Sequence, residues 1–235
     1  NQLEPEIKTL LKPKQHIIQR EPLSINPFRR QMQDITGQSI LEKSITTSER
    51  VTGVFSEVYN FGDQQRSALY EAIKTWLELN QDKQMNLNDL IMQLRGLESQ
   101  KSTIGKAASS VISKITPFVD QKPFGGKAEE SWDELYKNLE EKCHIIQLSG
   151  FLKPSARLIT EFLLIDLYWY YRLRGNQNNP RVLVLDEVQN LDHKQGSPLA
   201  QLLTEGRKFG FSLILATQTM SNLDKDEKDR LFNAA

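Results

Sequence analysis

The chain has 235 residues, with 30 Lys and Arg against 30 Asp and Glu, so its formal net charge at pH 7 is zero. This balance gives no global electrostatic case for nucleic-acid binding, although a basic channel would occupy only a small part of a surface. The single cysteine, Cys143, excludes an internal disulfide framework and favours a reducing compartment. No secretory signal opens the sequence, and the longest apolar stretch, 161–171, is too short for a membrane span and contains Asp166. We therefore expect a cytoplasmic chain with no membrane contact.

Residues 1–60 carry weak structural signals, which we assign to the early part of an α/β core. The apolar spacing predicts a helix ending near Leu11 and a short strand at 16–19. Ile25-Asn26-Pro27-Phe28 predicts a turn. Residues 35–55 are poorly periodic.

Residues 61–142 are predicted to form a helical insertion. Apolar residues recur at helical spacing in four stretches. These stretches are 63–79, a helix capped by Asn86 or Asn88 and running to Leu97, 103–119 with a break at Pro117, and 129–141. The four helices do not repeat one another, so we expect an inserted layer between strands of the core.

Residues 143–235 alternate between strand and helix signals. The expected elements are a strand at 143–148, a long helix from Pro154 or Ser155 to Arg174, a strand at 181–185, a helix at 198–209 and a strand at 211–216. A charged segment that we expect to be helical follows from Leu223 to the last residue. Strands that alternate with helices predict an α/β fold with a parallel sheet.

Two adjacent carboxylates end the apolar strand at 181–185. Open α/β sheets bind ligands at the carboxyl ends of their strands, where Asp186 and Glu187 stand. The pattern is typical of the Walker B strand of P-loop ATPases. In that interpretation Asp186 holds Mg²⁺ through water, and Glu187 activates the water that attacks the terminal phosphate of ATP. The alternative is a buried strand that ends in a solvated acidic turn.

The next predicted strand ends in Thr217-Gln218-Thr219. A right-handed crossover places this strand beside the acidic one, so Gln218 is expected near Glu187. A glutamine there would contact both the attacking water and the γ-phosphate and so act as a sensor. The alternative role for Gln218 is a hydrogen-bonding cap of the strand.

These motifs resemble the HerA/FtsK group of DNA-pumping ATPases. The resemblance rests on Asp-Glu-Val-Gln-Asn-Leu at 186–191, Glu-Gly-Arg-Lys-Phe-Gly at 205–210 and Leu-Ala-Thr-Gln at 215–218. The Gly-Arg-Lys-Phe-Gly wording looks most like the HerA branch, including the HerA-type ATPase of phosphorothioate-dependent DNA restriction systems. The specific match covers residues 180–223, and the Asn-Pro pair at 26–27 is a weaker point of resemblance.

The resemblance implies a RecA-like core that uses ATP and Mg²⁺ and assembles as a homo-hexamer on double-stranded DNA. A nuclease or another restriction or DNA-processing subunit is the implied partner. Arg207 resembles the basic residue that precedes the sensor strand in this group and reaches the nucleotide of a neighbouring subunit. Its alternative role is that of a cation favoured by the dipole at the end of a helix.

The phosphate-binding sequence Gly-x-x-x-x-Gly-Lys-Ser/Thr is missing from this sequence. Gly105-Lys106 and Gly126-Lys127 are each followed by alanine, and glutamine stands where each motif needs its first glycine. We therefore expect the middle-to-late part of a longer ATPase, inactive without the missing segment.

Three functions remain open from the sequence. The first is an ATP-driven DNA translocase of the HerA/FtsK type in DNA processing or anti-phage restriction. The second is an ATPase that drives protein secretion or remodelling, because those relatives carry similar acids and glutamine. The third is a scaffold in which nucleotide binding orders an assembly without turnover.

Overall fold

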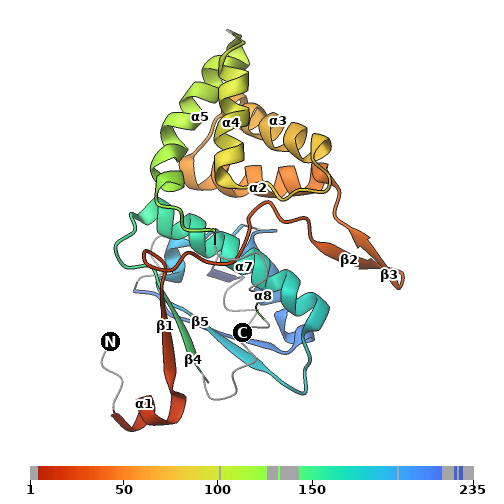
Figure 1. Ribbon diagram of the computed structural model, residues 1–235. Coiled ribbons are helices and arrows are strands. Elements are labelled where there is room, and N and C mark those ends of the chain that lie inside the picture. Colours follow the sequence, from red (N-terminus) through yellow and green to blue (C-terminus); the bar gives the residue numbers. More distant parts are fainter. Residues whose placement is uncertain are drawn as a thin grey trace.

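The computed structural model describes residues 5–100, 102–125, 132, 143–194, 196–218, 225–226 and 228–229. Its helices are α1 (Pro5–Leu11), α2 (Ser44–Tyr59), α3 (Asp63–Leu79), α4 (Leu87–Glu98), α5 (Thr103–Asp120), α7 (Lys153–Arg174) and α8 (Pro198–Glu205), with 3-10 helices η1 (Val188–Asn190) and η2 (Gly206–Phe209). Its strands are β1 (Pro13–Ile17), β2 (Met32–Ile35), β3 (Gln38–Leu41), β4 (Cys143–Gln147), β5 (Arg181–Leu185) and β6 (Phe211–Leu215). Figure 1 shows α2 to α5 grouped on one side of α7, with the parallel strands on the other. Within this described part, no helix has the length and apolar character needed to cross a lipid bilayer.

The strands in the described part of the chain form three pairs. β5 pairs with β6 and β1 pairs with β4, both in parallel, whereas β2 and β3 form an antiparallel hairpin. The predicted mixed α/β class with parallel pairing is confirmed. Among the described residues the strands make separate two-stranded sheets instead of one continuous ladder. The sequence did not predict this division, because hydrophobic patterns locate strands without specifying which backbones pair.

The connection from β5 to β6 is the unit that positions the candidate site. Ser197 caps α8 by accepting a hydrogen bond from the amide of Ala200 at 3.2 Å, and Pro198 opens the helix where its missing N–H costs nothing. η2 then ends at Phe209 and is followed by Gly210, whose φ is +78°. The predicted order of strand, helix and strand is confirmed here.

One face of the β5–β6 pair is covered and the other is open. On the covered side the ring of Tyr171, on α7, lies 4.4 Å from that of Phe211, and Leu185 is 8% exposed. On the open side Val182 and Val184 are 62% and 60% exposed. Parallel strands are buried on both faces only where helices cover both faces. Among the described residues, helices cover only the face that carries Leu185 and Phe211.

The helical group matches the sequence prediction in α3 and α4 and departs from it in α2 and α5. Asn86 caps α4, with its side chain accepting from the amides of Asn88 and Asp89. α2 begins within the stretch at 35–55, whose poor periodicity did not predict a helix. α5 passes through Pro117 to Asp120, so the predicted break at that proline is wrong.

Packing explains why α5 continues past its proline. Phe118, the next residue, is fully buried and its ring lies 6.1 Å from that of Phe55 and 6.0 Å from that of Phe124. The lost backbone bond costs about 3 kcal/mol in a helix interior, and a buried phenylalanine contributes a similar amount. Tertiary burial therefore offsets the local cost.

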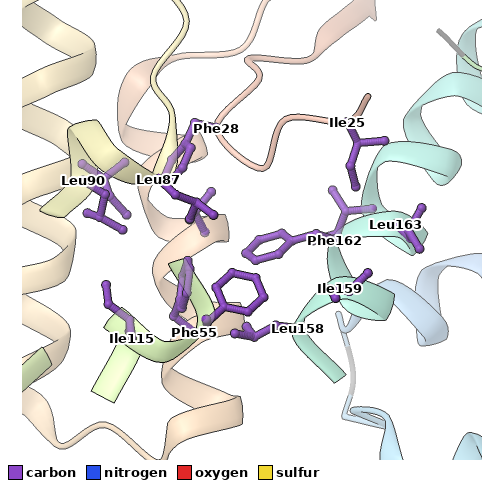
Figure 2. Packing of buried hydrophobic residues seen from close by; sticks show 14 of the residues in the cluster. Ile25, Phe28, Phe55, Leu87, Leu90, Ile115, Leu158, Ile159, Phe162 and Leu163 are labelled. Carbon is purple, nitrogen blue, oxygen red and sulfur yellow. The ribbon is translucent and has the colours of Figure 1, made fainter. Parts of the chain in front are cut away.

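A shared hydrophobic core joins the helical group to α7. Phe55 on α2 lies 5.5 Å from Phe162 on α7, measured between ring centroids. Figure 2 shows Phe55 and Ile115 on one side facing Leu158, Ile159 and Phe162 on the other. Four of the side chains in Figure 2 are Leu87, Leu90, Ile25 and Phe28, all buried in the same cluster.

The predicted helix at 129–141 lies outside the described residues except for Trp132, whose indole N–H donates to Asp166 Oδ2 at 2.8 Å. Most of the charged segment that begins at Leu223 also lies outside them.

Candidate functional site

The carboxyl ends of β5 and β6 meet at one edge of their sheet. Leu185 pairs with Leu215, and the backbone ladder continues beyond the strands. The amide of Ala216 donates to Leu185 O at 2.8 Å, and the amide of Val188 donates to Ala216 O at 3.0 Å. The two loops that leave the strands are therefore fixed to each other by the backbone.

Three side-chain amides converge on the carboxylate of Glu187. Gln189 Nε2 and Asn190 Nδ2 donate to Oε2 at 2.9 and 3.1 Å, and Gln218 Nε2 donates to Oε1. Thr217 in turn donates its hydroxyl to Gln189 Oε1 at 2.7 Å. Gln218 thus lies beside Glu187, as the crossover geometry predicts, and the amides hold the carboxylate in one orientation.

The backbone of Glu187 is left-handed. Its φ is +56° and its ψ is 37°, a conformation uncommon for residues other than glycine, asparagine and aspartate. Asp186 Oδ1 accepts the amide of Glu187 at 2.9 Å and so braces this turn. Such backbone conformations cost of order 1–3 kcal/mol and cluster at functional sites. The turn aims the Glu187 side chain toward Gln218.

The donor set at this edge fits magnesium held together with a nucleotide. Asp186 is exposed, and it is the first of two adjacent carboxylates. Mg²⁺ usually takes one or two protein carboxylates and completes its shell with water and phosphate oxygens. Within the described residues no cluster of three or more His, Cys, Asp or Glu side chains forms a self-contained metal site.

Arg207 lies at the opposite edge of the sheet. It belongs to η2, which precedes β6, whereas Glu187 follows the far end of β5. A five-residue strand spans about 16 Å, so the structure does not bring Arg207 to the three residues at the carboxyl edge. Its side chain is exposed, and Gln177 Nε2 donates to its carbonyl oxygen at 3.5 Å.

The Gly105-Lys106 pair does not form a phosphate loop. Gly105 is in the first turn of α5, and the preceding element is α4 instead of a strand. The amide of Gly105 donates to the Ser102 hydroxyl at 3.2 Å as part of the helix cap. Gly126 and Lys127 lie outside the described residues.

Pairing between distant strands produces one contact that spacing along the sequence does not predict. His16 on β1 and His144 on β4 stack with ring centroids 5.3 Å apart, and His16 Nε2 lies 3.1 Å from His144 Nδ1. The two residues are far apart in sequence and meet because β1 and β4 pair in parallel.

The sequence interpretation did not assign roles to Gln189, Asn190 and Thr217. A signal was present, because two amide side chains directly follow the acids, but their approach to Glu187 depends on the left-handed turn. Glu161 was also missed: its Oε1 accepts the amide of Asp192, in the loop after η1, at 2.7 Å. A single glutamate in the apolar stripe of a long helix is the only trace that this contact leaves in the sequence.

Comparison of the sequence with models of protein families and with curated proteins finds no match. Comparison of the structure with solved structures finds the bacterial conjugative coupling protein TrwBdeltaN70, in a trigonal form in complex with sulphate. The TM-score is 0.54 and the identity 14%, and the match covers 97% of this chain. The chain spans 63% of the length of the coupling protein's chain. These values establish the fold, a mixed α/β arrangement of the RecA-like type.

Proposed function

We propose that this chain is part of an ATP-driven DNA motor of the HerA/FtsK type. The observation that carries the proposal is the contact between Glu187 and Gln218 at the carboxyl ends of two parallel strands. Because Glu187 and Gln218 share a hydrogen bond, a phosphate that moves one of these side chains would also move the other. The fold likeness to a conjugative coupling protein supports the same class.

In the proposed reaction each side chain has a separate task. Glu187 accepts the proton of the attacking water, and its three amide donors keep the carboxylate oriented toward that water. Gln218 moves with the γ-phosphate and carries the change to Glu187. Asp186 would hold Mg²⁺ through water, and this ion would neutralise charge on the β- and γ-phosphates. A phosphate loop elsewhere in the full-length protein would supply the cradle that this sequence lacks.

Within this group we assign the chain to the HerA branch, acting in DNA processing or anti-phage restriction. This assignment rests on the sequence Glu-Gly-Arg-Lys-Phe-Gly at 205–210. We propose a cytoplasmic homo-hexamer that uses ATP and Mg²⁺, binds double-stranded DNA and works beside a nuclease. The proposed organisation is an early core segment at 1–60, a helical insertion at 61–142 and the late core at 143–235.

Glu187→Gln in the full-length protein tests this proposal. Because a neutral amide cannot accept the proton and cannot accept all three donors, we expect turnover to fall by roughly 10²–10⁴-fold, with ATP affinity retained. ATP hydrolysis and nucleotide binding are measured with and without duplex DNA. Duplex DNA should stimulate the unmodified protein.

Each alternative function gives a different result in these assays. Hydrolysis that ignores DNA but responds to a protein client identifies a secretion or remodelling ATPase. Nucleotide binding without turnover in the unmodified protein identifies a scaffold. Unchanged turnover in Glu187→Gln contradicts the role assigned to Glu187.

A further inference from the structure

A cluster of charged side chains lies where α2 and α7 meet the loop that follows η1. We call it the rear cluster. Its members are Glu57 on α2, Arg157 and Glu161 on α7, and Asp192 and Lys194 in the loop. The proposed reaction assigns no task to any of them.

Glu161 is the most buried member of the rear cluster. Its side chain is 3% exposed, and its Oε1 accepts the amide of Asp192 at 2.7 Å. Arg157 Nε lies 3.9 Å from the same oxygen, and within the described part of the chain Oε2 has no hydrogen-bond partner. A buried carboxylate with only some of its hydrogen bonds made lowers the stability of the fold. The contact between Glu161 and Asp192 is therefore present despite a cost in stability.

The loop from Glu187 to His193 is closed by its own hydrogen bonds. The amide of Asn190 donates to Glu187 O at 3.0 Å, and the amide of Leu191 donates to Val188 O at 3.0 Å. His193 Nε2 lies 2.9 Å from the same Val188 carbonyl. Since a carbonyl only accepts, this nitrogen carries the proton. These bonds tie the loop to itself, and Glu161 holds the amide of Asp192 near its end.

We infer that Glu161 is a positioning residue for Glu187, acting through the amide of Asp192. The inference rests on the proposed function, because it concerns the carboxylate assigned to water activation. Glu161 does not touch that carboxylate. It fixes the far end of the loop against α7, while Gln218 and the backbone of Ala216 fix the near end.

A second link connects the same loop to α2. Lys194 Nζ lies 2.6 Å from Glu57 Oε2, and Arg157 Nη2 lies 3.8 Å from Glu57 Oε1. Lys194 is 64% exposed and Glu57 33%, so solvent screens this pair and it contributes little. The loop is therefore positioned mainly by the buried contact between Glu161 and the Asp192 amide.

The burial of Glu161 makes this contact sensitive to pH near neutrality. Burial raises the pKa of Glu161 to about 7, whereas the Asp192 amide and Arg157 act to lower it, and Asp192 and Glu57 add a further rise. Protonation weakens the bond to the Asp192 amide, because a charged acceptor binds an N–H more strongly than a neutral one. We therefore expect turnover to fall as the pH drops through neutrality.

Three variants of the full-length protein test the inference. Glu161→Leu keeps the volume and removes the acceptor; Glu161→Gln keeps an acceptor oxygen that does not titrate. Glu42→Gln is the matched control, because Glu42 is also buried but pairs with Arg50 on α2. For each variant we measure kcat and KM for ATP across pH, cooperative unfolding, and hydrogen exchange of the amides at 187–194.

Glu161→Leu is expected to lower kcat by roughly 10–100-fold with KM unchanged, since small misplacements of reacting groups have effects of this size. In the same variant, hydrogen exchange of the loop amides should become faster. Glu161→Gln should restore most of kcat and loop protection and remove the decline on the acid side of neutrality. Glu42→Gln should lower stability without a selective fall in kcat.

Unchanged loop exchange in Glu161→Leu overturns the inference, and so does a Glu161→Gln variant as impaired as Glu161→Leu. If the unmodified protein shows no ATPase activity, the proposed function fails. Hydrogen exchange still decides in that case whether Glu161 holds the loop.

Discussion

The carboxyl group of Glu161 links the pH of the solution to the stability of the fold. Its pKa rises from 4.5 to about 7 because burial disfavours the charged form. The folded protein therefore binds more protons than the unfolded chain between these values, and the free energy of unfolding falls as the pH rises through them. Above the pKa of the folded state Glu161 is charged, and the full destabilisation caused by burying that charge is present.

We expect Glu161→Gln to remove this pH dependence. At 1.36 kcal/mol per pKa unit, the difference in unfolding free energy between variant and unmodified protein should move by roughly 2–3 kcal/mol in favour of the variant from about pH 5 to about pH 8. Urea unfolding at both pH values measures it. A constant difference would mean that Glu161 titrates in the folded state as it does in the unfolded chain.

Residues at strand ends were easier to predict than residues that support them. Asp186 and Gln218 follow apolar runs, and the fixed hand of the crossover places their loops side by side. Glu161 differs, because its partner is a backbone amide 31 positions away. No side-chain pattern marks a backbone amide, so only the folded chain reveals this contact.

Among the secondary-structure elements, α2 shows how a helix escapes prediction. Its buried face includes Thr47, Ser48, Thr52 and Ser56 beside Val51 and Phe55. Hydroxyl residues on the buried side remove the contrast that makes an apolar stripe visible, and threonine has low helix propensity. The helix is stabilised by tertiary packing against α3 and α7. α3 and α4 were predictable because their buried faces are mainly leucine, isoleucine and alanine.

Two glycines, Gly210 at the junction between η2 and the turn before β5 and Gly53 inside α2, are expected to respond in opposite ways to alanine. A Cβ at Gly210 would lie 2.3 Å from the carbonyl oxygen of Asn176, and its φ is +78°. We expect Gly210→Ala to destabilise the fold by roughly 2–4 kcal/mol. A Cβ at Gly53, inside α2, meets nothing within 4 Å.

Gly53→Ala is the matched control for that junction and should stabilise by about 0.5–1 kcal/mol, because alanine favours the helix. Thermal and urea unfolding of both variants test the pair. Equal effects would show that backbone geometry does not separate the two positions.

At the scale of the whole molecule, the position of Arg207 bears on assembly. Arg207 is exposed at the sheet edge opposite Glu187, so it lies away from the Glu187 of its own chain. If it serves a neighbouring subunit, Arg207→Ala should lower turnover by roughly 10³–10⁵-fold. Mixing this variant with Glu187→Gln should then restore part of the activity, because some interfaces combine an intact Glu187 with an intact Arg207.

Lys208→Ala is the control for this experiment, since Lys208 is the adjacent exposed cation on η2. ATP hydrolysis is measured over a series of mixing ratios. Activity that never exceeds the sum of the two separate variants would place the role of Arg207 within its own subunit or at the surface.

The left-handed backbone at Glu187 has a consequence for saturation mutagenesis. In a library randomised at this codon and selected for folding alone, Gly, Asn and Asp should be enriched, and Val, Ile and Thr depleted. Selection for hydrolysis should retain glutamate instead. The distance between the two rankings at this codon would measure how far natural selection has favoured chemistry over ease of folding.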